Sequence, residues 1–237
     1  MAQYIFWGTF FFAYLINGIT GFAGNIFAMP VGISTIGHET SIVVLNCTGW
    51  LASVMIAVTG LKHIVWREVL KMCVVMLIFM AVGAWINTVA PLDYLTKVYG
   101  IAIEIIAIRG LFFNKSNKAL PNWLLWIILA FGGIIQGMFV SGGSFLAIYA
   151  LQKIPDKEAF RATTTMCWVI LNGAYALFGI VQGGLAGDGL MILLVCIPLL
   201  IIATWLGGKI QKRISQEQFT KFTYVLLVVV GLVMLFK

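Results

Sequence analysis

Small polar residues and glycines gather in two short stretches of an otherwise apolar chain. The first reads Ala23-Gly24-Asn25 and the second reads Ser141-Gly142-Gly143-Ser144. Glycine lets the backbone approach a ligand closely, and a helix that begins at such a turn offers unpaired N–H groups and the positive end of its dipole. An anion can exchange its water shell for these donors without a buried Lys or Arg. Both stretches are therefore candidate anion-binding sites, with side-chain donors from Asn25 and Ser144.

Further uncharged donors follow each glycine-rich stretch. The additional candidate substrate contacts are Asn46, Thr164, Thr165 and Asn172. Their amides and hydroxyls can donate hydrogen bonds to an anion. Helix capping, or bonding to the carbonyl one turn earlier, explains the same residues without a ligand. Close helix packing likewise explains the glycines, so both interpretations remain open.

Glu104 is an acid inside an apolar segment, and Arg109 follows it. A carboxyl group in lipid favours its protonated form, so Glu104 is the candidate for coupling transport to H⁺. The alternative is a structural pair with Arg109, although the two lie further apart than the three or four residues that favour pairing on a helix.

Other kinds of chemistry lack the residues that they need. The chain has no nucleophile–base set, no phosphate-binding loop and no metal-ligand cluster. Ser141 does not sit in a Gly-x-Ser-x-Gly elbow, and the four cysteines show neither metal nor disulfide spacing. We therefore expect no enzyme activity, no metal and no cofactor.

The composition is that of a polytopic membrane protein. The 237 residues are 62% hydrophobic and 10% charged, with a mean hydropathy of +1.04, whereas soluble domains are about 45–50% apolar and about 25% charged. The net charge of +7 marks cytoplasmic loops and not a nucleic-acid partner. The first residues lack a basic segment, so no cleaved signal peptide is expected.

Charged residues are costly in hydrocarbon, so the gaps between them outline the membrane segments. Two gaps, 2–37 and 119–152, are too long for one spanning helix of about 20 residues and are broken by glycines. We expect each to fold back as two short helices, either re-entrant or spanning. The expected elements are a hairpin at 2–37 with spans at 40–61, 68–90 and 92–113, a linker at 114–122, and a hairpin at 123–152 with spans at 162–182, 187–208 and 217–236.

The two halves are related by a shift of 119 residues (137 minus 18), which aligns Gly18 with Gly137 and Asn25 with Ser144. Aligned loops carry opposite charge bias: the loop at 62–71 is basic, whereas its counterpart at 183–188 has no Lys or Arg. Such a reversal indicates halves that face opposite ways.

The predicted fold is therefore an all-α polytopic membrane protein of two inverted-topology repeats, 1–113 and 123–237. Each repeat has one broken or re-entrant helical hairpin and three transmembrane helices. The linker 114–122 is expected in the cytoplasm and both termini outside. Eight simple crossings are the alternative.

The segment Gly137–Ala150, followed by Glu158–Thr164, resembles the second half of the TauE/SafE-type sulfite exporters, and Gly207-Gly208-Lys209 is also similar. The resemblance extends over essentially the whole chain, because both halves carry the duplicated pattern. It implies a secondary transporter of a sulfur-containing or other small organic anion in a bacterial or archaeal inner membrane.

The expected activity is export of sulfite, a sulfonate or a related carboxylate by alternating access. An anion channel and a non-transporting accessory subunit of the membrane are the alternatives. The expected partners are a small anionic substrate and the lipid bilayer, with H⁺ as a possible coupling ion and a second copy of the chain as a possible partner.

Overall fold

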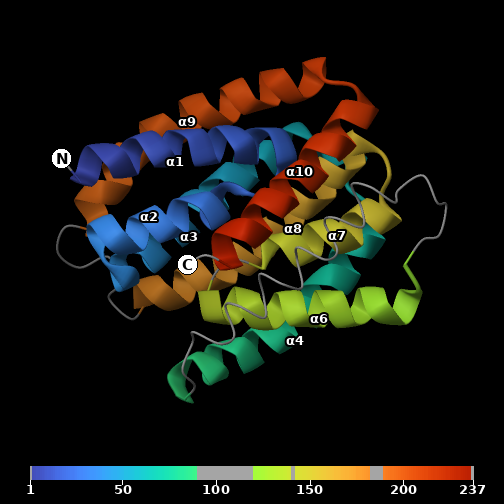
Figure 1. Cartoon of the computed structure of the whole chain (residues 1–237), viewed down its shortest axis with the longest axis horizontal. Helices are drawn as coiled ribbons and strands as arrows, with labels where there is room; N and C mark the ends of the chain where they lie inside the picture. Colours follow the sequence, from blue (N-terminus) through green and yellow to red (C-terminus); the bar gives the residue numbers. More distant parts are fainter. Residues whose placement is uncertain (1, 90–119, 140–141, 182–188, 236–237) are drawn as a thin grey trace. The chain divides into compact units, whose positions relative to one another are not determined.

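The computed structural model describes residues 2–89, 120–139, 142–181 and 189–235, which are helical almost throughout and contain no strand (Figure 1). The first elements are α1 (Ala2–Thr20), α2 (Gly24–Ile36), α3 (His38–Thr59), the 3₁₀ turn η1 (Leu61–His63) and α4 (Trp66–Val89). The later elements are α6 (Asn122–Phe139), α7 (Gly143–Lys153), α8 (Lys157–Val181), α9 (Gly189–Arg213) and α10 (Gln216–Leu235). The predicted span 92–113 with Glu104, most of the linker 114–122, and Ser141 lie outside the described residues.

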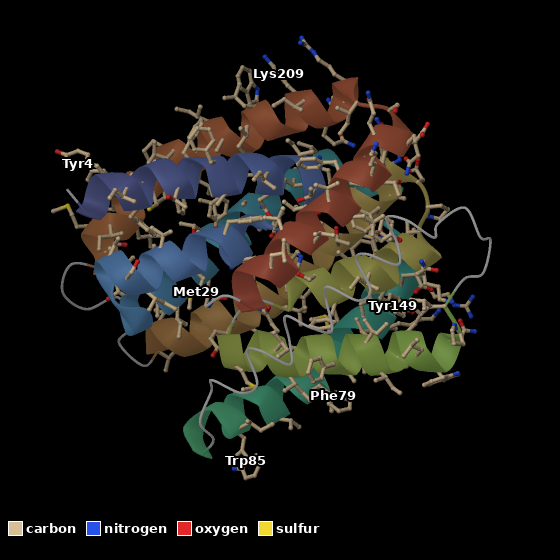
Figure 2. The ribbon with its side chains drawn as sticks, viewed as in Figure 1. Tyr4, Met29, Phe79, Trp85, Tyr149 and Lys209 are labelled. Atoms are coloured by element: carbon tan, nitrogen blue, oxygen red, sulfur yellow. The ribbon has the colours of Figure 1, made fainter. Side chains whose placement is uncertain are left out.

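Several helices are suited to a bilayer, because a helix satisfies its own backbone hydrogen bonds in lipid. The stretches Thr40–Thr59, Trp66–Ile86 and Gly189–Arg213 are long and apolar enough to cross a membrane. Large apolar side chains also project from the surface, among them Trp85 of α4, which is 66% exposed (Figure 2). The chain is a multi-pass membrane protein.

The helices form two compact units. The first unit comprises residues 1–73 and 161–213, and the second comprises residues 74–160 and 214–237. The first unit therefore holds α1, α2, α3 and α9 with most of α8, while the second holds α6, α7, α10 and the later part of α4. Each unit draws helices from both halves of the sequence, so the boundaries of the two repeats remain a prediction.

In the first unit, α1 and α2 form an antiparallel hairpin, with α2 returning beside α1 (Figure 1). The contacts run in opposite directions along the two helices: Gly24 lies against Tyr14, and Gly32 lies against Phe6. Gly21, between the helices, has a φ of +85°, a conformation that glycine adopts easily.

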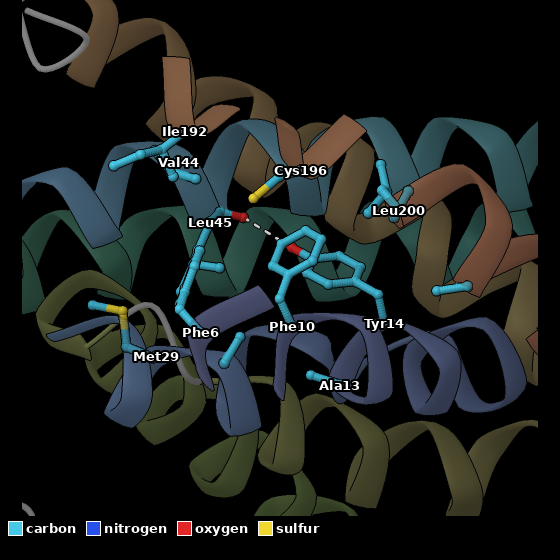
Figure 3. Packing of buried hydrophobic residues seen from close by; sticks show 13 residues of the cluster. Phe6, Phe10, Ala13, Tyr14, Met29, Val44, Leu45, Ile192, Cys196 and Leu200 are labelled. Atoms are coloured by element: carbon cyan, nitrogen blue, oxygen red, sulfur yellow. Dashed lines mark hydrogen bonds between the residues drawn. The ribbon is translucent and has the colours of Figure 1, made fainter. Parts of the chain in front are cut away.

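The core of this unit lies between α1, α3 and α9 (Figure 3). Phe10 and Tyr14 of α1 stack with ring centroids 4.4 Å apart, and Leu45 and Cys196 are fully buried in the same cluster. Because lipid tails are as apolar as these side chains, the cluster is stabilised by van der Waals packing between the helices.

The helix α3 also packs against α8 in the first unit, and the two helices run antiparallel. Gly49 of α3 lies against Asn172 of α8, whereas Gly60, further along α3, lies against Ala162, which comes earlier in α8. This register places Asn172 of α8 beside α3 at Gly49.

The second unit repeats the hairpin arrangement with α6 and α7. Gly132 lies against Phe145, and the rings of Trp126 and Tyr149 are 5.9 Å apart between centroids. Gly137 of α6 packs directly on the backbone of Met80 in α4, so α6 and α4 approach each other closely.

Candidate functional site

The break between α1 and α2 is closed by one residue, Asn17. The N–H of Gly21 donates to the backbone oxygen of Asn17 over 2.7 Å, and the N–H of Gly24 donates to Asn17 Oδ1 over 3.3 Å. Asn17 is only 7% exposed. It therefore satisfies a backbone donor on each side of the turn and sets where α2 begins.

Gln136 likewise accepts a backbone hydrogen bond at the other glycine-rich stretch, where the N–H of Gly142 donates to Gln136 Oε1 over 2.9 Å. The shift of 119 residues aligns Gln136 with Asn17 (136 minus 17). Our sequence analysis did not identify these two residues. The available signal was a pair of carboxamides at aligned positions, shortly before each glycine-rich stretch.

Asn25, in the first turn of α2, is held by Tyr14 of α1. The Tyr14 hydroxyl donates to Asn25 Oδ1 over 2.8 Å and lies 2.8 Å from Thr48 Oγ1 of α3. The first turn of α2 has no acidic residue, and Ala23 at its N-cap makes no side-chain hydrogen bond. Because the carboxamide oxygen is held by Tyr14, the NH₂ group of Asn25 must point elsewhere.

That NH₂ group faces Gly49, where α3 presents bare backbone. A Cβ atom at Gly49 would lie 3.0 Å from Asn25 Nδ2, 3.2 Å from Asn25 Oδ1 and 3.1 Å from Asn172 Nδ2. Asn25 and Asn172, both predicted site residues, are therefore brought together from α2 and α8 on the surface of α3. We call these two uncharged side chains the carboxamide pair.

The predicted contacts Thr164 and Thr165 are fully buried beside Gly21. Both hydroxyls donate to the backbone oxygen of Arg161, over 3.1 Å and 2.7 Å respectively. Both hydroxyl protons therefore bond a carbonyl within α8. This geometry favours the interpretation in which the threonines bond to the carbonyl one turn earlier and not to a ligand.

Asn46, another predicted contact, presents an acceptor. Its Nδ2 donates to the backbone oxygen of Ile42 over 2.8 Å. Its Oδ1 is buried and has no hydrogen-bond partner among the residues described here. A buried polar atom without a partner is costly, so this oxygen is a candidate contact for a donor on a ligand.

The start of α7 lies in the second glycine-rich stretch that the sequence analysis identified as a candidate anion-binding site. Gly143 begins the helix after Gly142, no acidic residue lies in its first turn, and the segment from Gly143 to Ala150 is buried. Ser144 Oγ is fully buried and lacks a hydrogen-bond partner within the described part of the chain. This hydroxyl is free to donate to an anion at the positive end of the helix dipole.

Arg161 contacts the end of α1 through its guanidinium Nε. Its Nε donates to the backbone oxygen of Gly18 over 2.9 Å, in the last turn of α1. A cation is favourable at the C-terminal end of a helix, where carbonyl groups lack partners. This contact favours a role in anchoring α1.

An apolar cavity of about 330 Å³ lies between α3, α8 and α9 in the first unit. Cys47, Trp50, Gly173 and Leu177 are among its lining residues. It contains none of the predicted donors, so it is suited to hydrocarbon and not to an anionic group.

The sequence matches a known transport family along nearly its full length. The model of the family described as "Sulfite exporter TauE/SafE" matches residues 6–234. The chain belongs to the TauE/SafE sulfite exporter family. Membership of a transport family agrees with the expectation that the chain is not an enzyme.

Among characterised sequences, this TauE/SafE family member is similar to the "Probable sulfite/organosulfonate exporter TauE" of Cupriavidus necator. The two are 23% identical over 239 aligned positions, which cover 94% of this chain and 88% of the relative. No solved structure gives a significant match.

The predicted site residues of this TauE/SafE chain divide between the two units. Asn25, Asn46, Thr164, Thr165 and Asn172 belong to the first. The tip at Gly142, Gly143 and Ser144 belongs to the second. We predict that the two glycine-rich helix starts bind the same substrate molecule.

Proposed function

We propose that this chain is a secondary transporter that exports sulfite or a small organosulfonate across a bacterial or archaeal inner membrane by alternating access. The observation that carries the proposal is the chemistry at the starts of α2 and α7. Each start has no acidic residue in its first turn, and each carries an uncharged side-chain donor, Asn25 or Ser144. Helix starts of this kind stabilise an anion without a buried cation.

The fold supports the same proposal through its repeated contacts. Gly18 and Gly137, aligned by the shift of 119 residues (137 minus 18), each lie against backbone of a helix from the other half. Thr204 of α9 is the neighbour of Gly18, and Met80 of α4 is the neighbour of Gly137. Together with the antiparallel packing of α3 and α8, these contacts agree with two inverted repeats, which place substrate at discontinuous helices in known transporters.

The finer features of the mechanism are part of the proposal. Both termini lie outside, Glu104 carries the coupling proton, and two copies of the chain associate in the membrane. The substrate is a sulfur oxyanion, as the printed description of the C. necator relative indicates for that protein.

Ligand-dependent thermal stability tests the binding site. Purified protein in detergent is expected to gain stability with sulfite or methanesulfonate, and Asn25→Leu and Ser144→Leu should each abolish that gain by removing a donor. Ser34→Leu is the matched control, because Ser34 is an exposed residue of α2, the helix that carries Asn25. Unchanged stabilisation in both site variants would contradict the proposed site.

Flux measurements separate the alternatives. Uptake into liposomes that saturates and is stimulated by counterflow identifies a transporter. Uptake that does neither identifies a channel, and absence of flux from folded, ligand-binding protein identifies an accessory subunit.

A further inference from the structure

The apolar cavity between α3, α8 and α9 has no role in the proposed function. It measures about 330 Å³, whereas an apolar cavity of about 150 Å³ can already bind benzene and stays free of water. Its lining includes Leu51, Ala176, Leu193 and Ile197. Atoms that line an unfilled cavity lose the dispersion contacts that a neighbour provides. A hydrocarbon ligand would supply these contacts.

The lining residues of α3 lie at a depth where hydrocarbon is available. Trp50 and Leu51 are at the middle of the stretch Thr40–Thr59, which is long and apolar enough to cross a membrane. The hydrocarbon core of a bilayer is about 30 Å thick, so the middle of a crossing helix is surrounded by acyl chains and lies beyond the reach of the lipid headgroups.

The cavity is open at the surface of the first unit. Its lining residue Leu177 is 67% exposed, and Trp50 and Ile180 are exposed as well. Ala176, another lining residue, is buried, so the lining extends from the surface into the interior. The helix α9 carries further exposed apolar side chains, such as Leu194. The cavity therefore continues an apolar surface that is suited to contact with lipid.

Trp50 adds a second, independent observation. Tryptophan is enriched at the membrane–water interfaces, whereas Trp50 is at the middle of an apolar stretch. Its indole lies against Gly173 of α8, where a Cβ atom would be 3.0 Å from Trp50 Nε1 and 3.1 Å from Trp50 Cδ1. Gly173 thus leaves room for the indole, which gives the cavity a flat and rigid side.

We propose that this cavity binds one acyl chain of a membrane phospholipid, which enters from the bilayer beside Leu177. The acyl chain fills the space between α3, α8 and α9 and contacts the indole of Trp50. Because three helices contact it, this lipid should remain bound in detergent, whereas lipids that touch only the outer surface exchange for detergent. The proposal concerns a second ligand and does not depend on which anion the protein transports.

A photoactivatable phospholipid tests the proposal on the purified full chain. The probe is phosphatidylglycerol with a diazirine group on one acyl chain, added to the protein in detergent and activated by light. Peptide mass spectrometry should find adducts concentrated at the lining residues Leu177 and Ile180, and not at Trp85, an exposed residue of α4. Excess unlabelled phosphatidylglycerol should suppress these adducts. Adducts spread evenly over the exposed apolar positions would overturn the proposal.

Two variants block the cavity in different ways. Leu177→Trp enlarges a side chain at the opening, and Ala176→Phe fills the interior, so each should abolish the adducts at Ile180. Leu70→Trp is the matched control, because Leu70 of α4 is also 67% exposed and lies outside α3, α8 and α9. It should keep full labelling. Unchanged labelling in both cavity variants would overturn the proposal.

Thermal unfolding provides a readout that does not depend on the photochemistry. Phosphatidylglycerol added to delipidated protein should raise the melting temperature of the unmodified chain and of Leu70→Trp. It should not raise the melting temperature of Leu177→Trp, whose cooperative unfolding without lipid shows that the variant folds. An equal rise in Leu177→Trp and Leu70→Trp would count against the cavity as the site.

A second copy of the chain is the other occupant that the test distinguishes. Light scattering in detergent reports the oligomeric state of each variant. Conversion of a dimer to a monomer by Leu177→Trp, with phospholipid adducts unchanged, would overturn the proposal in favour of an interface between copies. Loss of the adducts with the oligomeric state unchanged supports the acyl chain.

Discussion

Tyr14 fixes the orientation of the Asn25 carboxamide at the start of α2. Its ring is fully buried and stacks on Phe10, and its hydroxyl bridges Asn25 of α2 and Thr48 of α3. A carboxamide that rotates freely presents oxygen and nitrogen equally well to a ligand. With its oxygen fixed by a donor, Asn25 presents nitrogen, which is what an anion requires.

Tyr14→Phe should weaken anion binding through Asn25. The ring and its packing remain, but one hydrogen bond worth about 0.5–1.5 kcal/mol is lost, so we expect an apparent Kd that rises up to about tenfold for methanesulfonate. Binding is measured by ligand-dependent thermal shift. Tyr4→Phe, at a 73% exposed position of the same helix, should leave the Kd unchanged.

A double-mutant cycle separates positioning from general stability. Asn25→Ala removes the carboxamide without filling the site with a large side chain, so we expect weak residual binding at high methanesulfonate concentration, and Tyr14→Phe should cause no further loss of that affinity, because the group through which it acts is gone. Additive losses would show that Tyr14 affects binding without Asn25.

At the scale of the elements, α1 and α9 pack with their backbones in close contact at two glycines. A Cβ atom at Gly18 would lie 2.8 Å from the backbone oxygen of Thr204, and Gly207 lies directly on the backbone of Leu15. Backbone atoms in a helix cannot yield as a flexible side chain can. The α1–α9 contact therefore depends on the absence of side chains at both positions.

Gly18→Val should separate α1 from α9 and lower the melting temperature of the protein in detergent. Overpacking of a tight contact costs about 1–3 kcal/mol, and sometimes more. Gly8→Val provides the control in the same helix, since a Cβ at Gly8 meets nothing within 4 Å. An equal melting temperature for the two variants would show that the α1–α9 contact contributes little to stability.

At the scale of the whole molecule, the packing of helices from the two halves bears on the proposed membrane topology. Both compact units take helices from each half of the sequence, and α3 packs antiparallel on α8, its aligned counterpart. Antiparallel packing of aligned helices is expected when one repeat is inverted relative to the other. A parallel duplication of the halves would orient these two helices the same way.

Single cysteines at exposed positions test the inverted topology. In a chain without its native cysteines, Lys62→Cys and Lys209→Cys should react with an impermeant maleimide from the same, cytoplasmic side. Tyr4→Cys should react from the opposite side, because the N-terminus is expected outside. Reaction of positions 62 and 209 from opposite faces would support eight simple crossings.

Local properties of the sequence were sufficient to predict an all-helical membrane protein, whereas the assigned spans and hairpins stay predictions. Charges are costly in lipid and glycines weaken helices, and the described glycine-rich residues 23–25 and 142–144 lie at the starts of α2 and α7. These effects depend only on residues that are close together in the chain, so they can be predicted from the sequence. Membership of the TauE/SafE family, inferred from the same stretches, is confirmed by the match over residues 6–234.

The partners of the site residues could not be predicted in this way. Tyr14 meets Thr48, Asn25 and Asn172 meet at Gly49, and Arg161 meets Gly18, all across long separations in the chain. Such pairs depend on where two helices cross and on the space that a glycine leaves between them. The hydrophobic periodicity of the sequence predicts neither the crossing point nor that space. A charged or polar residue in an apolar run must find a partner in the fold, but which partner it finds follows from packing in three dimensions.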